Sequence, residues 1–278
     1  MDTATHMLRT GRRGALLEAQ MALRDLRASG ERIDLAWSLA WHDVVSRYRG
    51  SILGPFWITL SMGVMVLGIG LLWGGLFRVP AHQFVPMVAV GIVFFGMVTM
   101  TINEGCETFV QAAGMLSQTS LPIFTFVWRT VLRNLINLGH HIVIVAAVLV
   151  WAGLWGHANY LGAALGFVFL VVNVAWASMS VAIISARFRD IPQAVASITQ
   201  AAAIMTPVYW PADRIPPSYR WVLDFNPFYH VLDAVRAPLL GEAVAPHTYG
   251  VLAGMAAGGW ALTFWLFART RRKIVHYL

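Results

Sequence analysis

Long stretches of this chain carry almost no charged residues, and their length limits its fold more than any other feature. Six of them are long and apolar enough to cross roughly 30 Å of hydrocarbon. Charged residues make up only 12% of the chain, against about 25% in ordinary soluble domains. The predicted spans are Phe56–Phe77, Phe84–Asn103, Val127–Trp151, Tyr160–Ser185, Ala194–Trp210 and Tyr249–Ala268. The sequence therefore predicts an all-α integral membrane protein with six transmembrane helices per subunit.

These spans divide the chain into three parts. Residues 1–55 are expected to form a cytoplasmic N-terminal region, residues 56–268 the transmembrane domain, and residues 269–278 a short cytoplasmic tail. Because residues 1–33 lack the apolar core of a signal peptide, the first span is expected to act as an uncleaved insertion signal. The fifth span is the shortest, and Pro207 is expected to distort its outer end.

The basic residues predict the orientation. With both termini in the cytoplasm, the inner side receives the basic residues before the first span, near the start of the third, after the fourth and in the tail. The outer side then receives only four of the 20 Lys and Arg residues, namely Arg78, Arg214, Arg220 and Arg236. This bias is the one that cytoplasmic loops of membrane proteins show. The net charge of +7 thus has a topological explanation, and we expect no nucleic-acid partner because no aromatic-basic module appears.

The end of the N-terminal region has the pattern of an amphipathic helix over Leu35–Tyr48, with Asp34 as its expected N-cap. The apolar side carries Trp37, Trp41, Val44, Val45 and Tyr48. The polar side carries Ser38, His42, Asp43 and Ser46. Such a helix is expected to lie along the cytoplasmic membrane face with its tryptophans among the lipid headgroups. Packing against a soluble partner stays open as an alternative.

The stretch Pro211–Thr248 is too polar to cross the membrane and too aromatic for a simple connector. Trp221–Phe225 and Tyr229–Leu240 are predicted to be two short re-entrant helices separated by Asn226-Pro227. Irregular backbone within a bilayer is tolerated only against protein or water, so this hairpin is expected to line a cavity.

Aromatic residues gather at the predicted outer mouth. They are Tyr209, Trp210, Tyr219, Trp221, Phe225, Phe228 and Tyr229. An interfacial aromatic belt explains such a group, and so does a platform on which sugar rings stack. Both interpretations stay open.

The chain lacks the motifs of an ATPase or a metal site. It has no glycine-rich phosphate-binding loop followed by Lys-Ser or Lys-Thr, and its single cysteine, Cys106, excludes a multi-cysteine site. The spans also lack the carboxylates that coupled secondary transporters use. We therefore expect no catalytic residue, metal or cofactor in this chain, and a partner ATPase as the energy source.

Two cytoplasmic segments are candidates for docking this partner. The first is the predicted loop Glu104–Pro122, to which Glu104, Glu107, Gln111, Gln118 and Ser120 give a polar side. The second is the short loop Arg187–Asp190, which contains Arg187 and Asp190 at its ends. Solvated loops that simply follow the charge bias are the alternative for both.

Four motifs in register resemble polysaccharide ABC exporter permeases, the subunits that export O-antigen, capsule or teichoic-acid chains. They are Arg47–Trp57 (RYRGSILGPFW), Ala186–Ile191 (ARFRDI), Pro207–Pro211 (PVYWP) and Asn226–His230 (NPFYH) followed by Arg236. The resemblance covers nearly the whole chain from residue 34 onward.

The resemblance implies a homodimer of this chain above two nucleotide-binding subunits, which would bind ATP and Mg. The amphipathic helix with Trp37, Trp41 and Tyr48 would be the interface helix, and Glu104–Ser120 the coupling region. Residues of about 211–247 would form periplasmic gate helices. The cargo would be a glycan on undecaprenyl diphosphate, with O-antigen favoured over capsule or teichoic acid.

Two site hypotheses accompany this resemblance. Arg47 and Arg49 are expected to attract the carrier's diphosphate where the interface helix meets the first span. The conduit and gate aromatics are expected to be Tyr209, Trp210, Tyr219, Trp221, Phe228 and Tyr229.

Two rival functions stay open, and the first of them belongs to another class of protein. A membrane-embedded lipid-carrier transferase would use the outer carboxylates, which are Asp213, Asp224, Asp233 and Glu242. Their spacing forms no recognisable site. A drug- or lipid-exporting ABC permease is the other, and the small outer loops disfavour it.

Overall fold

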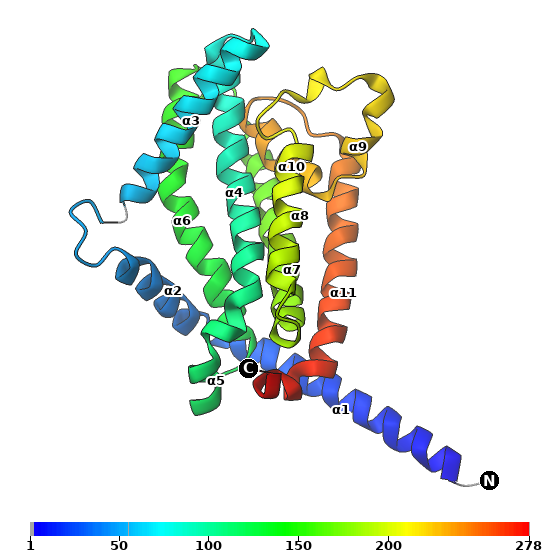
Figure 1. Ribbon diagram of the computed structural model, residues 1–278. Coiled ribbons are helices and arrows are strands. Elements are labelled where there is room, and N and C mark those ends of the chain that lie inside the picture. Colours follow the sequence, from blue (N-terminus) through cyan, green and yellow to red (C-terminus); the bar gives the residue numbers. More distant parts are fainter. Residues whose placement is uncertain (1–2, 55, 278) are drawn as a thin grey trace.

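A computed structural model of the chain describes residues 3–54 and 56–277. Residues 1, 2, 55 and 278 lie outside the description, as do the side chains of residues 3–13, 15, 16, 272 and 275. Pro55 of the RYRGSILGPFW motif and the last residue of the predicted tail are therefore outside it. The regular elements of the described residues are all helical (Figure 1). In chain order they are α1 (Thr3–Glu31), α2 (Ile33–Arg47), α3 (Phe56–Phe77), α4 (Ala81–Gln111), α5 (Ala113–Gln118), α6 (Phe124–Trp151), α7 (Tyr160–Arg187), α8 (Ile191–Met205), η1 (Ala212–Arg214), η2 (Pro217–Tyr219), α9 (Trp221–Asp224), α10 (Pro227–Leu239) and α11 (Pro246–Tyr277).

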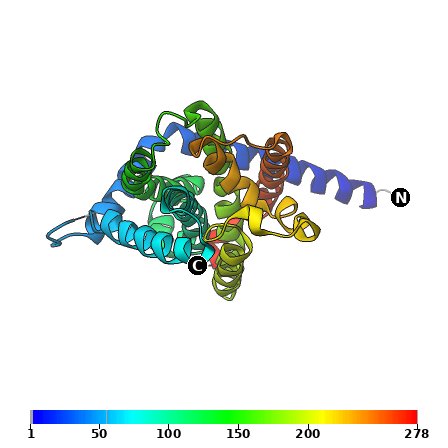
Figure 2. The ribbon, with the colours of Figure 1, turned by 90° about the horizontal axis from the view of Figure 1, so that it is seen from above.

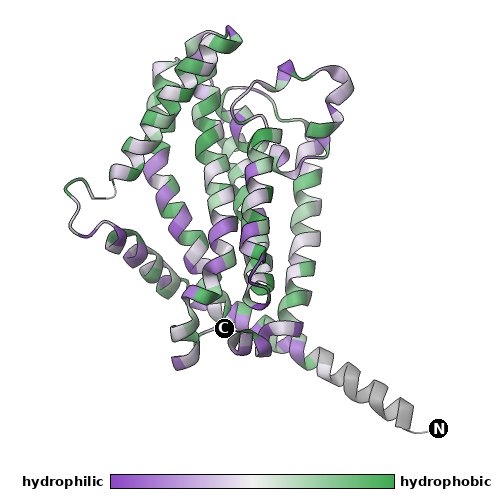
Figure 3. Ribbon diagram, in the orientation of Figure 1, coloured by the Kyte–Doolittle hydropathy of each residue, from purple (hydrophilic) through white to green (hydrophobic). Residues whose placement is uncertain are grey.

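Five of the described helices are long and apolar enough to span a membrane: α3, α4, α6, α7 and α11. The predicted all-α membrane fold is thus confirmed, and apolar residues dominate the upright helices in Figure 3. The predicted fifth span is α8, an apolar helix of only 15 residues. At 1.5 Å per residue it is about 22 Å long, which is less than the hydrocarbon thickness of roughly 30 Å.

Helix α4 forms the centre of the bundle. It contacts α3, α6, α7, α8 and α10, and 72% of its apolar span is buried by other parts of the chain. The corresponding share of α3 is only 17%. The inner core is therefore built around α4, whereas most of the α3 surface faces outward from this single chain.

Several helix ends differ from the predicted bounds. Helix α4 continues to Gln111, so Glu104 and Glu107 lie on a helix rather than in a loop. Helix α11 continues to Tyr277, through the segment predicted as a tail. Helix α8 ends at Met205, before Pro207, because the residue that precedes a proline disfavours helical backbone. Tyr209 and Trp210 therefore follow the helix instead of belonging to it.

The amphipathic helix α2 is present, but its predicted cap is wrong. Its predicted polar side is exposed at Ser38, His42 and Ser46 but not at Asp43. The helix begins at Ile33 with Arg32 at the N-cap, and no side chain caps it, so Asp34 is not the N-cap. Its buried face consists of Ala36, Ala40 and Val44, packed against α6. Trp37 and Trp41 are about half exposed, at 49% and 51%. Small residues thus make the packing face, and the tryptophans point to the surroundings.

One end of the bundle gathers α2, α5, part of α1 and both chain termini, and we call it the inner end (Figure 1). The buried carboxylate of Asp25, in α1, accepts hydrogen bonds from the backbone N–H groups of Ile123 and Phe124 at 3.2 and 3.1 Å. It also forms an ion pair with Arg271 of α11 at 3.1 Å. Asp25 therefore caps the N-terminus of α6 from another helix and joins α1, α6 and α11.

Candidate functional site

A polar groove of about 460 Å³ lies between α3, α4 and α8. Helices α3 (cyan) and α8 (yellow-green) flank α4 when the bundle is seen from above (Figure 2). The polar residues of this groove are Thr99, Asn103, Thr199, Gln200 and Tyr209. Asn103 donates to Thr199 at 3.0 Å, which ties α4 to α8. The groove thus offers hydroxyl and amide groups within an otherwise apolar bundle.

Helix α8 carries a polar stripe beside this groove. Gln193, Ser197 and Gln200 are exposed and follow the spacing i, i+4, i+7, so they share one face of the helix. Polar side chains are rarely left facing lipid hydrocarbon. Sequence reasoning missed this stripe, although the helical spacing of the two glutamines was a readable signal.

A second hollow, the outer cavity, lies at the opposite end from the termini and has a volume of about 700 Å³. Its walls come from the turn after α3, the start of α4, the segment after α6, η1, and α10 with the residues that follow it. Its charged residues are Arg78, Arg214, Arg236, Asp213, Asp233 and Glu242. Three of the four outer carboxylates therefore line one cavity, although their spacing in sequence forms no recognisable site. Their spacing in sequence gave no sign of this because three separate segments bring them together.

The PVYWP and NPFYH motifs meet beside the outer cavity. Asn226 caps α10 by accepting from the N–H groups of Phe228 and Tyr229, and its amide donates to the Thr206 hydroxyl at 3.0 Å. The buried Arg236 guanidinium donates to the Pro207 carbonyl. Two side chains of the α10 region thus hold the end of α8. Burial is the largest influence on Asp233 and raises the pKa of its carboxyl, although Arg236 opposes it.

The predicted conduit aromatics do not form one surface. Tyr209 lines the polar groove and Tyr229 lines the outer cavity. Phe228 packs on Phe95, with ring centroids 5.9 Å apart. Trp210 donates to the Ile204 carbonyl at 3.1 Å. The remaining aromatics are exposed on the outer surface, namely Tyr219, Trp221 and Phe225.

Ion pairs join three helices at the inner end. Asp43 of α2 pairs with Arg129 at 2.6 Å and with Arg133 at 3.2 Å, both on α6. Arg133 also pairs with Glu104 of α4 at 2.7 Å, and Asn134 donates to the same carboxylate at 2.7 Å. Burial alone would raise the pKa of Asp43, but the two arginines outweigh it and hold that pKa below its ordinary value. Asp43, predicted on the polar exposed side, lies instead in this largely buried network.

The predicted docking residues are placed unequally. Glu104 points into the ion-pair network rather than outward. Glu107 and Gln111 are exposed and bond to each other at 2.7 Å. Gln118, on α5, and Asp190 are exposed too. Arg187 lies over the rings of Phe188 and Tyr277, at 5.1 and 5.9 Å.

Arg47 and Arg49 are both exposed where α2 leads toward the first span. Both guanidinium groups are therefore accessible at the inner end, as diphosphate attraction would require. The interaction itself stays a prediction.

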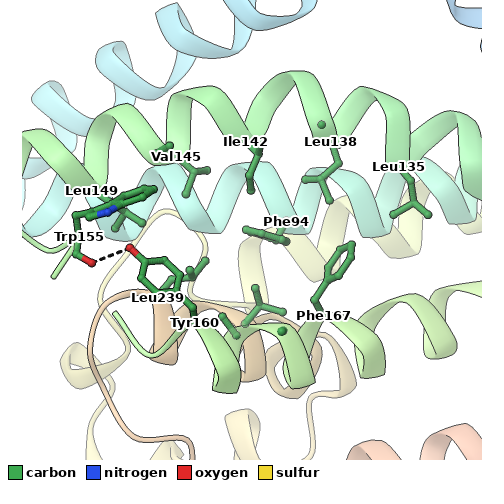
Figure 4. Close-up of a pocket in the computed structure, with 15 residues that line it drawn as sticks. Phe94, Leu135, Leu138, Ile142, Val145, Leu149, Trp155, Tyr160, Phe167 and Leu239 are labelled. Atoms are coloured by element: carbon green, nitrogen blue, oxygen red, sulfur yellow. Dashed lines mark hydrogen bonds between the residues drawn. The ribbon is translucent and has the colours of Figure 1, made fainter. Parts of the chain in front are cut away.

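A third hollow is apolar. It has a volume of about 600 Å³ and opens between α6 and α7, where Leu138, Ile142 and Val145 face Phe167 and Tyr160 (Figure 4). The hydroxyl of Tyr160 is already donated to the Trp155 carbonyl at 2.7 Å. These walls suit lipid hydrocarbon and offer few groups that would hold a sugar.

The fold defines a multi-pass helical membrane protein with a polar groove among its helices. More closely, the chain belongs to the ABC-2 type transporter family, which matches residues 34–240. It is also similar to the O-antigen export system permease protein RfbA of Klebsiella pneumoniae, with 20% identity over 205 residues. That match covers 71% of this chain and 77% of the relative. Membership of the family implies an ATPase partner subunit, and the resemblance to polysaccharide ABC exporter permeases is confirmed at this level.

Proposed function

We propose that this chain is the membrane subunit of an exporter that moves undecaprenyl-diphosphate-linked polysaccharide, with O-antigen of lipopolysaccharide as the favoured cargo, across the bacterial inner membrane. The observation that carries the proposal is the polar groove between α3, α4 and α8. Its hydroxyl and amide groups match sugar hydroxyls, which both donate and accept hydrogen bonds. The similarity to an O-antigen export permease of Klebsiella pneumoniae supports the same cargo class.

Two copies of the chain form the pathway in this proposal. The outward surfaces of α3 and α8 supply the contact, because α3 is the least buried of the spans and α8 exposes its polar stripe. A second copy would cover these surfaces and turn two grooves into one conduit. In that setting α8 serves as the sixth span, shielded from lipid despite its short length.

The inner end faces the cytoplasm in this proposal. The charge bias predicts that orientation, and the structure places both termini at that end. Helix α2 is the interface helix, with Trp37 and Trp41 among lipid headgroups. The end of α4 and α5, with Glu107, Gln111 and Gln118, is the coupling region seated on two ATPase subunits that bind ATP and Mg. Helices α9 and α10 are the gate helices.

Arg47 and Arg49 take the role of attracting the carrier's diphosphate. Their exposed guanidinium groups at the inner end suit a bidentate phosphate contact. An Arg47→Ala/Arg49→Ala double variant should export less glycan while inserting and binding its partner normally. Export at the wild-type rate would reject this role.

The test of the whole proposal uses cells that make lipid-linked polysaccharide but lack their own exporter. Surface glycan should appear when this chain and its ATPase are produced together. Surface glycan should be absent when the phosphate-binding lysine of the ATPase is replaced, so that ATP is no longer hydrolysed. Chemical analysis of the exported glycan distinguishes O-antigen from capsule and teichoic acid, and no surface glycan from the active pair would contradict the proposal.

The transferase alternative keeps one supporting observation. Asp213, Asp233 and Glu242 share the outer cavity, and carboxylates can act as acids or bases in group transfer. Product formation from a lipid-linked sugar by the purified chain, without an ATPase, would favour this alternative over export.

A further inference from the structure

The outer cavity contains acceptors and donors in balance. Three carboxylates, from Asp213, Asp233 and Glu242, can only accept hydrogen bonds, while three guanidinium groups, from Arg78, Arg214 and Arg236, can only donate. Their formal charges cancel, so the cavity offers no net attraction to a diphosphate. Sugar hydroxyls use both kinds of partner, and hydrogen bonds to charged groups are the stronger ones.

These six charged side chains form few ion pairs with one another. Among the residues that the structure describes, Asp233 and Arg236 form the one ion pair within this set, and their nearest atoms are 3.8 Å apart. This separation exceeds hydrogen-bond distance. Arg214 reaches only the Phe77 carbonyl, at 3.4 Å. Arg236 is buried and already donates to the Pro207 carbonyl. The charged groups that stay available to a ligand or to water are the exposed ones, namely Arg78, Asp213, Arg214 and Glu242.

Arg78 occupies an unusual backbone conformation at the edge of the cavity. Its φ is +55°, and it follows the end of α3, where the Val79 N–H bonds back to the Gly74 carbonyl. This is the position at which a helix end prefers glycine. An arginine held in the left-handed region suggests a use for its side chain.

The outer cavity lies beyond the outer end of the polar groove along α4. Both hollows are lined by α4 and by the segment that follows α8; α3 lines the groove, and the turn after α3 lines the outer cavity. Along α4 the cavity ends at Met87 and the groove begins at Ile92, which is about 7.5 Å of helix. Between them α4 packs tightly on the segment after α8, since a Cβ at Gly91 would lie 2.9 Å from the Val208 carbonyl oxygen. A chain that leaves the groove past this contact meets the outer cavity next.

We propose that the outer cavity is a binding site for uncharged sugar units of the glycan as they leave the membrane. The inference rests on the proposed function and names a second contact for the same cargo. A volume of about 700 Å³ lies within the range of about 300–1,000 Å³ that small-molecule sites occupy. The site holds sugars through charged hydrogen-bonding groups, whereas the groove offers neutral ones.

Protection of an introduced cysteine tests the proposal. Gln83 lines the cavity and is exposed, so Gln83→Cys places a thiol there. Ser218→Cys is the matched control, because Ser218 is exposed on the outer side but does not line the cavity. The natural Cys106 is buried and should stay unlabelled. The rate of reaction with a membrane-impermeant maleimide is measured with the ATPase present, in cells that do and do not make the glycan.

Glycan synthesis should slow the labelling of Gln83→Cys several-fold and leave Ser218→Cys unchanged. Equal rates at Gln83→Cys with and without glycan would overturn the proposal, provided that the variant exports normally. Equal slowing at both positions would overturn it too, because it indicates general shielding of the surface. A thiol that never reacts would show that the cavity does not open outward.

A charge variant gives an independent readout. Asp213→Asn/Glu242→Gln changes two exposed side chains and should lower the rate of glycan export while the amount of assembled complex stays constant. An unchanged export rate would contradict the site. If the wild-type chain exports no glycan, the proposed function fails and this inference falls with it. If it exports while Gln83→Cys stays unprotected, only the outer site is wrong.

Discussion

The inner and outer ends of the helix bundle both gather charged side chains but use them differently. At the inner end, side chains of α2, α4 and α6 join in ion pairs of 2.6, 2.7 and 3.2 Å. At the outer end, six charged side chains line a hollow, and the nearest pair is 3.8 Å apart. At this end α10 is joined to the end of α8 by two hydrogen bonds. Asn226 donates to the Thr206 hydroxyl, and Arg236 donates to the Pro207 carbonyl.

This difference teaches that charge has two roles in one bundle. The inner pairs satisfy each other and hold three helices in register, which suits a region that must pass a partner's movement to the spans. Four of the six outer charged side chains are exposed, which suits a region that meets a polar cargo in the proposed exporter. The following predictions test this division, from the largest expected effect on stability to the smallest.

Loss of Arg133 should be the most damaging change at the inner end. Arg133→Ala leaves Glu104 without its ion-pair partner and weakens the hold on Asp43, and breaking a largely buried pair costs about 3–5 kcal/mol. Thermal unfolding in detergent micelles measures the loss. Arg189→Ala, at an exposed position, is the control. Equal unfolding temperatures for the two variants would break the comparison.

Gly166→Ala should be the most damaging change among those that touch no charge. A Cβ there would lie only 2.0 Å from the Ala234 carbonyl oxygen, so α7 and α10 would have to separate. Overpacking of this kind costs about 1–3 kcal/mol. Gly254→Ala in α11 is the control, because nothing lies within 4 Å of its Cβ position. Faster proteolysis of the α10 region in Gly166→Ala, but not in the control, is the expected result.

Asp25→Ala should destabilise the inner end through a lost helix cap. Removing a capping side chain costs about 0.5–2 kcal/mol, and Arg271 loses its ion-pair partner as well. Asp25→Asn keeps an acceptor and should lose less. Asp34→Ala, an exposed aspartate that caps nothing, should unfold like the wild type. Identical unfolding curves for Asp25→Ala and Asp34→Ala would contradict the role of Asp25 as a helix cap.

Acid should weaken the attachment of α2. The pKa of Asp43 in the folded chain is held below its ordinary value, so its ion pairs stabilise the fold above an unfolded pKa of about 3.9. That stabilisation is lost as the pH falls through the lower folded pKa. The unfolding temperatures of wild type and Asp43→Asn should differ at neutral pH and converge below about pH 4. A gap that persists far into acid would contradict this assignment.

Glu242→Gln should scarcely change stability. Its side chain is exposed in the outer cavity, and surface substitutions usually stay within about 0.5 kcal/mol. Thermal unfolding should match the wild type. A large loss would show that the outer charges stabilise the fold after all, and the contrast between the two ends would disappear.

The spans could be predicted from sequence because each carries its own signal, a long apolar run. The predicted first span, Phe56–Phe77, matches α3 at both ends. The hydrogen bonds of Asp25 and Asp43 could not be predicted, because their partners lie about a hundred residues away in the chain. The prediction of Asp34 as N-cap was wrong because the preference of aspartate for N-cap positions does not show where α1 ends and α2 begins.

The outer carboxylates show the same limit at the candidate site. Asp213, Asp233 and Glu242 lie on separate segments, and only the packing of η1 and α10 beside the ends of α3 and α4 brings them together. The polar stripe of α8 was different, since its spacing was visible in sequence. The aromatic group misled because Trp and Tyr suit a membrane interface and a sugar surface equally well.

The central claim is that this chain supplies a path but no driving force. The most direct measurement is the movement of a lipid-linked glycan across vesicles that contain the purified chain with or without its ATPase. Movement should require both proteins and ATP hydrolysis. Glycan transport, or chemical change of the glycan, by the chain alone would contradict the account.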